Sequence, residues 1–277
     1  MRLASWFLEH PHQIISLSAL GSDLGAAKAS LSEDIAIIDT ALRASGTGWL
    51  ETVAGQTGGV RFHVLQEAAQ VHAFIQRLCT LLADPQRLLP GGYLYLSDLL
   101  GDPAFVRQAS RIFAARFDQA GAQAVVTMET KGIPLAMSVG FFLGIPVVIV
   151  RHEDRVSEGT TVSVNYVSGS TGRLQTMRLA RRLLPSGTAV LLIDDFLRGG
   201  GTMRGLLDLL REFDADVRGL GVLVETQQPE QKLVSDYVSL ARITTVDGTA
   251  LSAQPGRDYL ASVPAPALSL SSLKEQI

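Results

Sequence analysis

Two acidic residues and a glycine triplet follow one strongly apolar run between Val190 and Thr202. The run shows no polar alternation, which is typical of a parallel strand buried on both faces. Apolar residues at helical spacing follow Thr202 and predict an amphipathic helix. Asp194, Asp195 and glycines 199–201 are therefore expected on a strand-to-helix loop at the carboxyl end of a parallel strand, where open α/β sheets bind ligands.

The residue types in this loop suit a phosphorylated sugar. Glycines permit positive φ and let consecutive N–H groups approach an anion, and the following helix directs its positive dipole end to the same place. Carboxylates beside such a cradle accept hydrogen bonds from sugar hydroxyls or help to hold a divalent cation. We expect the hydroxyls to face Asp194 and Asp195 and the 5′-phosphate to lie in the glycine loop.

Either half of this motif has a plainer explanation when it stands alone. Acid pairs also end the strands of Walker B motifs and of response-regulator receivers, and a glycine triplet can be only a loose turn. In this order and this close together they are far more specific. The stretch resembles the binding motif for phosphoribosyl pyrophosphate (PRPP) of type I phosphoribosyltransferases: a hydrophobic strand, two acids and a glycine-rich turn ending in Thr202.

Two further stretches contain residues that could bind an anion. Thr130, Lys131 and Gly132 precede Ile133-Pro134 in a second strand-end loop, which suits a pyrophosphate, although such a sequence is also an ordinary helix start. Residues 151–182 contain six arginines, and residues 160–167 within this stretch alternate like an exposed hairpin. A mobile, arginine-bearing flap could close over an anionic ligand, whereas a solvated charge run is the commoner explanation for any one arginine.

Strand and helix patterns alternate through the second part of the chain. Strands are predicted at 124–126, 146–150, 190–193 and 221–224, with helices at 134–143, at 177–184 and after residue 202. This alternation is typical of an α/β fold with a parallel sheet and helices on its faces.

Residues 1–73 predict a separate winged helix-turn-helix unit. Ser16 or Ser18 can cap a second helix, Ser30 and Glu33 fit the capping box of a third, and residues 49–53 and 60–64 flank a glycine-rich hairpin turn. In this fold the third helix enters the DNA major groove and the wing touches the backbone or the minor groove. The expected DNA-contacting residues are Lys28, Ser30 and Ser32 at the start of the third helix and Gln56, Thr57 and Arg61 in the wing.

The charge balance of this unit argues against strong DNA binding. Residues 1–73 contain four basic and seven acidic side chains, a net charge of −3, whereas neutralisation of phosphates dominates DNA affinity. A winged helix that serves only dimerisation therefore remains an alternative. In favour of DNA binding, the few basic residues cluster near the third helix and the wing, and a dimer would double them.

Composition excludes several other classes of protein. The 277 residues have one cysteine, Cys79, which rules out an internal disulfide, and five histidines without ligand spacing, so the sequence predicts no transition-metal site. No apolar run approaches the roughly 20 residues that span a bilayer. The apolar stretch at the amino terminus is too short for a secretion signal. We therefore expect a cytoplasmic protein.

Taken over almost the whole chain, the motifs resemble the purine-operon repressors of Gram-positive bacteria. The likeness includes His10-Pro11-His12, residues 29–34, Leu89 to Tyr93, residues 162–170 and the Asp194 motif. It implies a winged-helix DNA-binding domain at 1–73 fused to a phosphoribosyltransferase-like effector domain at 74–277 that has no known transferase activity. It further implies a homodimer that PRPP, with Mg²⁺ near the two aspartates, releases from operator DNA of purine genes, and a pocket for which guanosine tetraphosphate competes. The effector-binding residues implied are Tyr93, Thr130, Lys131, Gly132, Asp194, Asp195, Phe196, Leu197, Arg198, Gly199, Gly200, Gly201 and Thr202.

The chain departs from the family pattern at Arg198 and Gly199, where Lys and Ala are expected. The first change keeps the charge but offers a broader hydrogen-bonding fork. A catalytically active purine phosphoribosyltransferase remains the alternative function, because phosphoribosyl transfer needs little covalent help from the protein. The amino-terminal unit favours the repressor, since a metabolic enzyme has no use for a recognition helix and wing. An RNA-binding regulator on the same fold is a third, weaker alternative, because it would lack the winged helix.

Overall fold

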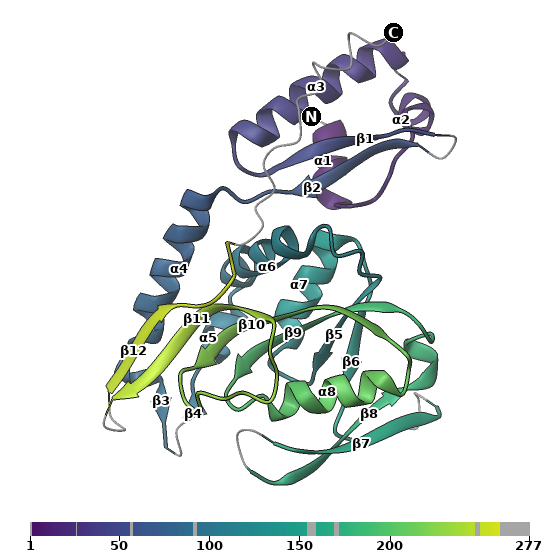
Figure 1. The fold of residues 1–277 in the computed structure, drawn as a ribbon. Helices are drawn as coiled ribbons and strands as arrows, with labels where there is room; N and C mark the ends of the chain where they lie inside the picture. Colours follow the sequence, from purple (N-terminus) through teal and green to yellow (C-terminus); the bar gives the residue numbers. More distant parts are fainter. Residues whose placement is uncertain are drawn as a thin grey trace.

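The structure is a computed structural model that describes residues 2–25, 27–55, 58–90, 93–153, 159–168, 172–246 and 250–260. Three helices and a hairpin form the amino-terminal unit, which lies at one end of the molecule (Figure 1). The helices are α1 (Arg2–Glu9), α2 (Leu17–Leu24) and α3 (Lys28–Ala44), and the antiparallel hairpin joins β1 (Gly48–Val53) to β2 (Gly59–Val64). The predicted order of a winged helix is confirmed.

The predicted caps of this unit are half right. The Ser16 side chain accepts a hydrogen bond from the backbone N–H of Ala19 and so caps α2, as predicted. The capping box of Ser30 and Glu33 is wrong, because Ala27 is already the N-cap of α3 and gives no side-chain hydrogen bond. Leu31 and Ile35 are buried in the core of the unit, which sets the face that α3 turns inward. Residues 28–30 are already helical, so the helix begins before Ser30. Ser30 therefore lies in the first turn.

A six-stranded sheet forms the centre of the second unit, in the order β12-β11-β10-β9-β5-β6. All neighbouring pairs are parallel except β11 with β12. The predicted α/β architecture with a parallel sheet is thus confirmed. The strands are β5 (Ala124–Met128), β6 (Val147–Val150), β9 (Ala189–Leu197), β10 (Asp216–Thr226), β11 (Tyr237–Val246) and β12 (Ala250–Pro255).

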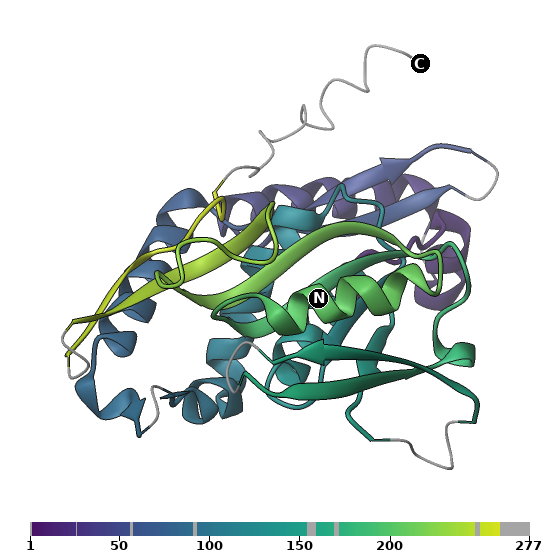
Figure 2. The same ribbon diagram turned by 60° about the horizontal axis from the view of Figure 1, so that its bottom comes forward.

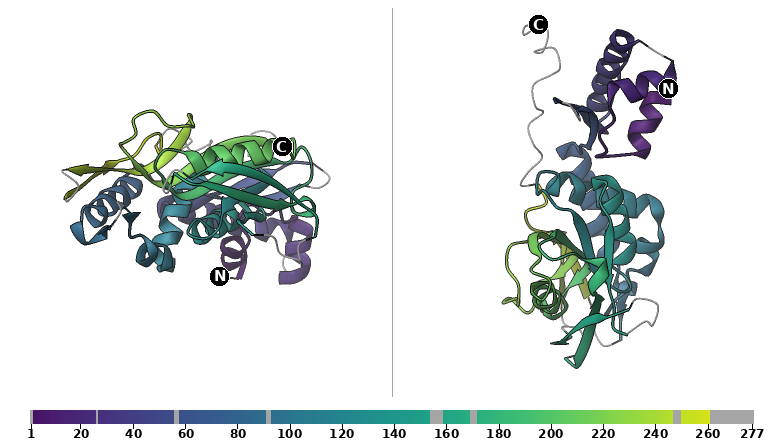
Figure 3. Two further views of the ribbon diagram at one scale, coloured as in Figure 1. Left: turned by 90° about the horizontal axis from the view of Figure 1, so that it is seen from below. Right: turned by 90° about the vertical axis from the view of Figure 1, so that its right-hand side faces the viewer.

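Helices cover both faces of this sheet (Figure 3). Helices α4 (Ala68–Leu82), α6 (Pro103–Phe117) and α7 (Ile133–Leu143) share one buried cluster with Leu191 and Ile193 of β9. Helix α8 (Gly201–Arg211) packs on the other face with Val190 and Leu192. Burial on both faces explains why β9 reads as an uninterrupted apolar run. The short elements between α4 and α6 are a 3-10 turn (Pro85–Arg87), β3 (Leu88–Leu89), β4 (Tyr93–Leu94) and α5 (Ser97–Gly101).

A hairpin of β7 (Thr161–Val167) and β8 (Leu174–Ala180) lies beside α8 (Figure 2). The predicted helix at 177–184 is wrong, since only Arg181–Leu183 forms a single 3-10 turn. Met177 and Leu179 are buried while Thr176 and Arg178 are less so, a period of two that suits a strand. Gly205 of α8 allows this close packing, because a Cβ there would lie 2.8 Å from the Cβ of Tyr166.

The two units share a continuous core and a polar contact. Phe7 of α1 and Phe62 of β2 belong to the same buried cluster as Phe113 of α6. In addition, Nη2 of Arg111 on α6 donates to the backbone oxygens of Thr47 at 2.7 Å and Leu65 at 3.0 Å. The expected domain division after residue 73 remains a prediction; it falls within α4, a helix that contacts β11 and β12 of the second unit.

Candidate functional site

The two predicted ligand loops meet at a topological switch point of the sheet. Strands β5 and β9 are neighbours, but the chain continues from β5 to β6 on one side and from β9 to β10 on the other. The loops that leave the carboxyl ends of β5 and β9 therefore flank one crevice, which is where open α/β sheets bind their ligands. Residues 129–132 and 198–200 form these loops.

A cavity of about 340 Å³ lies in this crevice. Both loops and the β7–β8 hairpin contribute to its wall. The predicted residues that line the cavity are Thr130, Lys131, Asp194, Asp195, Phe196, Leu197, Arg198, Gly200, Gly201 and Thr202. Tyr93, Gly132 and Gly199 are not in the lining: Tyr93 lies on β4 with 46% of its surface exposed, Gly132 lies against Thr127 and Asp194, and Gly199 lies near Pro229.

Asp194 and Asp195 bring two carboxylates into a largely buried place. Asp194 is 7% exposed, and its Oδ1 accepts a hydrogen bond of 2.9 Å from the backbone N–H of Asp195. Burial, reinforced by the neighbouring charge of Asp195, raises the pKa of Asp194 well above its ordinary value. Burial also raises the pKa of Asp195, although the positive charge of Lys131 lowers it in part. Ionised carboxylates in such a place gain from any hydroxyl donor or cation that a ligand supplies.

The glycine loop is held in shape by a segment that sequence reasoning missed. Gly200 has φ +86° and is the N-cap of α8, so the helix begins at the cavity. The backbone N–H of Leu233 donates to the carbonyl of Gly199 at 2.9 Å, and Nζ of Lys232 donates to that of Arg198 at 2.5 Å. The helix dipole and the first N–H groups of α8 therefore lie at an anion-binding position.

The hairpin also supplies site residues that were not predicted individually. Tyr166, Ser168 and Gln175 line the cavity, and the Tyr166 hydroxyl donates to Oε1 of Gln175 at 2.8 Å. His152 lines it as well, and its backbone N–H donates to Oε1 of Glu129 at 2.6 Å. The alternating pattern of 160–167 predicted the hairpin but not which of its faces meets the ligand. The hairpin's place in the cavity wall supports the flap hypothesis; Arg155 lies outside the described residues.

The predicted DNA-contacting residues fall on α3 and the hairpin. Ser30 and Ser32 are exposed near the start of α3. Arg61 lies on β2, with Nη1 3.8 Å from Oε2 of Glu51. Lys28 is the first residue of α3, but its side chain, like Gln56 and Thr57, lies outside the described residues. The assignment of these contacts stays a prediction.

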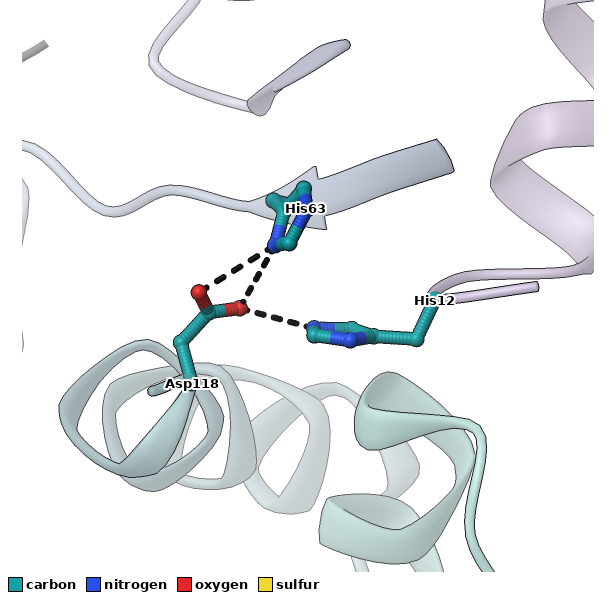
Figure 4. A group of neighbouring side chains, drawn as sticks. All are labelled: His12, His63 and Asp118. Carbon is teal, nitrogen blue, oxygen red and sulfur yellow. Dashed lines mark hydrogen bonds and ion pairs between the residues drawn. The ribbon is translucent and has the colours of Figure 1, made fainter. Parts of the chain in front are cut away.

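A side-chain cluster that the sequence did not predict lies between the two units. His12, His63 and Asp118 converge from three segments that are distant in the chain (Figure 4). Ligand spacing is a local pattern, so isolated histidines gave no signal. The packing of β2 on α6 brings His63 to Asp118, and the backbone N–H of His12 donates to the carbonyl of Phe62 on β2, which places His12 beside them. Among the described residues, no helix has the length and apolar character needed to cross a membrane.

Comparison with known proteins gives matches for both units. Residues 1–64 match the family "Bacterial purine repressor, N-terminal", and residues 96–254 match "Phosphoribosyl transferase domain". The purine biosynthesis transcriptional repressor of Bacillus subtilis is 45% identical over 88% of this chain and 86% of its own length. The purine biosynthesis transcriptional activator of Lactococcus lactis is 39% identical over 88% and 90%. The crystal structure of adenine phosphoribosyltransferase from Thermoanaerobacter pseudethanolicus has a TM-score of 0.53 at 19% identity, covering 61% of this chain and 99% of its own, which shows a shared fold.

Proposed function

The chain belongs to the family of purine biosynthesis transcriptional repressors of Gram-positive bacteria, in which the phosphoribosyltransferase domain serves regulation, and we propose that PRPP is its effector. In this proposal a homodimer binds operator DNA of purine genes in the cytoplasm. PRPP binds the cavity at the switch point and releases the DNA.

The observation that carries the proposal is the convergence of Asp194, Asp195 and Lys131 at one cavity that also contains the start of α8. The two acids offer acceptors for ribose hydroxyls, Lys131 offers a cation for the pyrophosphate, and the Gly200–Thr202 turn offers N–H groups for the 5′-phosphate. A ligand with hydroxyls in its middle and phosphates at both ends matches this distribution of charge.

The donor set also fits the Mg²⁺ that accompanies PRPP. Mg²⁺ prefers oxygen ligands and is commonly held by one or two carboxylates together with substrate phosphates. Asp194 and Asp195 present such oxygens where burial disfavours uncompensated negative charge, so the cation would relieve that cost. When bound, Mg²⁺ would neutralise the pyrophosphate, and the two aspartates would orient it.

A homodimer is supported by apolar side chains on α7. Met137 and Phe141 lie one helical turn apart and are 52% and 49% exposed, so they form an apolar patch on the helix surface. A second copy could cover them. Ligand binding could then favour a dimer with low DNA affinity, which requires only that PRPP prefer that state by a few kcal/mol. Guanosine tetraphosphate, which also carries pyrophosphate on a sugar, would compete for the cavity.

An active purine phosphoribosyltransferase is the second candidate, because the cavity that would bind PRPP as effector would equally bind it as substrate. The amino-terminal unit and the relatives named as transcriptional regulators favour the first candidate. Pyrophosphate release from PRPP with hypoxanthine, guanine, xanthine or adenine distinguishes the two. Turnover at the rate of an enzyme, about 1 per second or faster, would contradict a purely regulatory domain.

The experiment that tests the proposal is a mobility-shift titration of purine-gene control DNA with and without PRPP and Mg²⁺. The wild-type protein is expected to bind DNA and to dissociate as PRPP rises. The double variant Asp194→Asn/Asp195→Asn is expected to bind the DNA as tightly but to ignore PRPP. A double variant that dissociates like wild type would refute the role of the two aspartates.

A further inference from the structure

His12, His63 and Asp118 place three potential metal-ligand atoms within 4.8 Å of one another. Nε2 of His12 lies 2.7 Å from Oδ1 of Asp118, and Nδ1 of His63 lies 3.0 Å and 3.1 Å from the two carboxylate oxygens (Figure 4). The site is largely shielded from solvent: the side chains of His12, His63 and Asp118 are 13%, 3% and 5% exposed.

Both ring nitrogens of His63 face carboxylates, and Nε2 of His12 faces one of the same carboxylates. His63 contacts Asp118 through Nδ1 and Oε2 of Glu51 through Nε2, the latter at 2.9 Å. A neutral imidazole has one N–H, so it can donate to only one of these acceptors and directs a lone pair at the other. His12 meets the same carboxylate with an Nε2 that is buried, and its 2.7 Å contact lacks the geometry of a hydrogen bond. The arrangement therefore needs additional positive charge, which either protons or a metal ion can supply.

The surroundings of His63 resemble the outer shell of a metal site. A metal-bound histidine usually donates its other ring N–H to a carboxylate, which fixes the tautomer and the ring orientation. Glu51 is placed to accept that proton from Nε2, which leaves Nδ1 free to coordinate. The indole of Trp49 stacks on the His63 ring at 4.4 Å and 12°, and the Gln119 side-chain amide donates to Oδ2 of Asp118. The first ligands are thus oriented before a metal binds.

We propose that His12, His63 and Asp118 form a binding site for a divalent transition-metal ion of the zinc type, which fastens the winged-helix unit to the phosphoribosyltransferase unit. Two imidazole nitrogens and one carboxylate oxygen suit Zn²⁺, which binds them at about 2.0–2.2 Å in a tetrahedron that a water molecule can complete. Such bonds separate neighbouring ligand atoms by about 3.3 Å. The present nitrogen–oxygen contacts of 2.7–3.1 Å would have to open by a few tenths of an ångström, and the ligand nitrogens of the two imidazoles lie within 4.8 Å of each other.

The three ligands come from both units, so a bound metal would hold the units together. His12 follows α1 and His63 lies on β2, both in the amino-terminal unit, whereas Asp118 directly follows α6 of the second unit. Neither unit holds all three ligands, so the site exists only when the units are docked as in the structure. Metal binding therefore stabilises this docked arrangement against any other, by mass action. It does not involve the PRPP cavity.

The test uses the full-length protein after chelator treatment and dialysis, with Zn²⁺ for calorimetry and Co²⁺ for spectroscopy. We expect one tight site per chain, visible absorption typical of tetrahedral Co²⁺ with nitrogen and oxygen ligands, and a rise in Tm on adding Zn²⁺. His12→Gln and Asp118→Asn should each weaken Zn²⁺ binding at least tenfold and abolish the Tm rise. Glu51→Gln should weaken it by about 10- to 100-fold through loss of the outer-shell acceptor.

Matched controls separate this site from others. His72 is exposed on α4, so His72→Gln removes a histidine without touching the cluster and should bind Zn²⁺ like wild type. The variant Asp194→Asn/Asp195→Asn should also keep the site. The proposal is overturned if wild type takes up no stoichiometric Zn²⁺, if His12→Gln and Asp118→Asn bind it unchanged, or if the Tm responds to pH but not to Zn²⁺, which would mean that protons alone occupy the cluster.

Discussion

Gly132 lies so close to Asp194 that a Cβ added at position 132 would be 2.7 Å from Oδ1 of that carboxyl group. The same Cβ would be 2.4 Å from Oγ1 of Thr127. Gly132 belongs to the loop after β5 and Asp194 to β9, so the close approach is between that loop and the strand that carries the two acids. A side chain at 132 must displace the carboxylate that we assign to the ribose.

Gly132→Ala is therefore expected to weaken PRPP binding at least tenfold in calorimetry with Mg²⁺ present, while DNA binding without ligand stays unchanged. Gly101→Ala is the matched control, because nothing lies within 4 Å of a Cβ there and its φ is not positive. Equal PRPP affinity of Gly132→Ala and wild type would mean that the Asp194 carboxylate does not hold the ligand.

Asp194→Asn is expected to stabilise the ligand-free protein at pH 7. Burial raises the pKa of Asp194, which means that the folded state disfavours its charge, and an amide removes that charge. For a chain of this size, relief of about 1–2 kcal/mol raises Tm by a few degrees. Asp208→Asn is the control: Asp208 forms exposed ion pairs with Arg204 and Arg211 on α8, and its loss should leave Tm unchanged or slightly lower. A lower Tm for Asp194→Asn would contradict the expected cost of the charge.

The sequence predicted the site well where chemistry and backbone conformation are local. Asp194, Asp195 and the glycines after them specify a strand end, a turn and a helix start within a dozen residues, and the structure has all three. Lys131 could be placed in the same cavity because carboxyl ends of parallel strands share one edge of a sheet.

Features that depend on long-range packing were missed. Residues 174–180 pair with β7 and pack on α8, which overrides the helical spacing of their apolar residues. Lys232 supports the glycine loop from a segment with no periodic pattern. The cluster of His12, His63 and Asp118 arises only when two units dock, so it could not be predicted from the spacing of the histidines or from the charge of Asp118.

Glu225 is expected to make stability depend on acid pH. It is 1% exposed, and although burial alone would raise its pKa, hydrogen bonds from Tyr237, Ser239 and Arg242 outweigh burial and lower the pKa below the ordinary 4.5. A lowered carboxyl pKa gives stability that is present above the unfolded value and lost as pH falls through the folded value. Glu225→Gln should therefore cost about 2–4 kcal/mol at pH 7, because it leaves Arg242 near a neutral partner, and much less near pH 3.

Thermal unfolding of both proteins from pH 3 to pH 8 measures this difference. Glu230→Gln serves as control because Glu230 is exposed, and it should follow the wild-type curve. A Tm difference for Glu225→Gln that is the same at pH 3 and pH 7 would show that shape, rather than charge, is what the substitution removes.

Arg111 is expected to couple the two units. Its guanidinium donates to backbone oxygens of Thr47 and Leu65 from the far side of the unit boundary, so Arg111→Met leaves these acceptors without that donor. We expect a loss of about 1–3 kcal/mol and a weaker effect of PRPP on DNA release. Arg77→Met is the control, since Arg77 contacts Gln108 and the Phe74 ring within the second unit alone. Unaltered PRPP response in Arg111→Met would place the coupling elsewhere in the shared core.

The salt dependence of operator binding tests the assigned DNA contacts. Each neutralised phosphate adds about 0.9 to the slope of log affinity against log salt, so Lys28→Ala and Arg61→Ala should each reduce the slope by about that much. Arg43→Ala should not, because Arg43 is bound to Asp39 at 2.8 Å and stacks over Trp49, which engages its charge within the fold. Slopes that are unchanged for Lys28→Ala and Arg61→Ala but reduced for Arg43→Ala would move the DNA interface from the start of α3 and the wing to the carboxyl end of that helix.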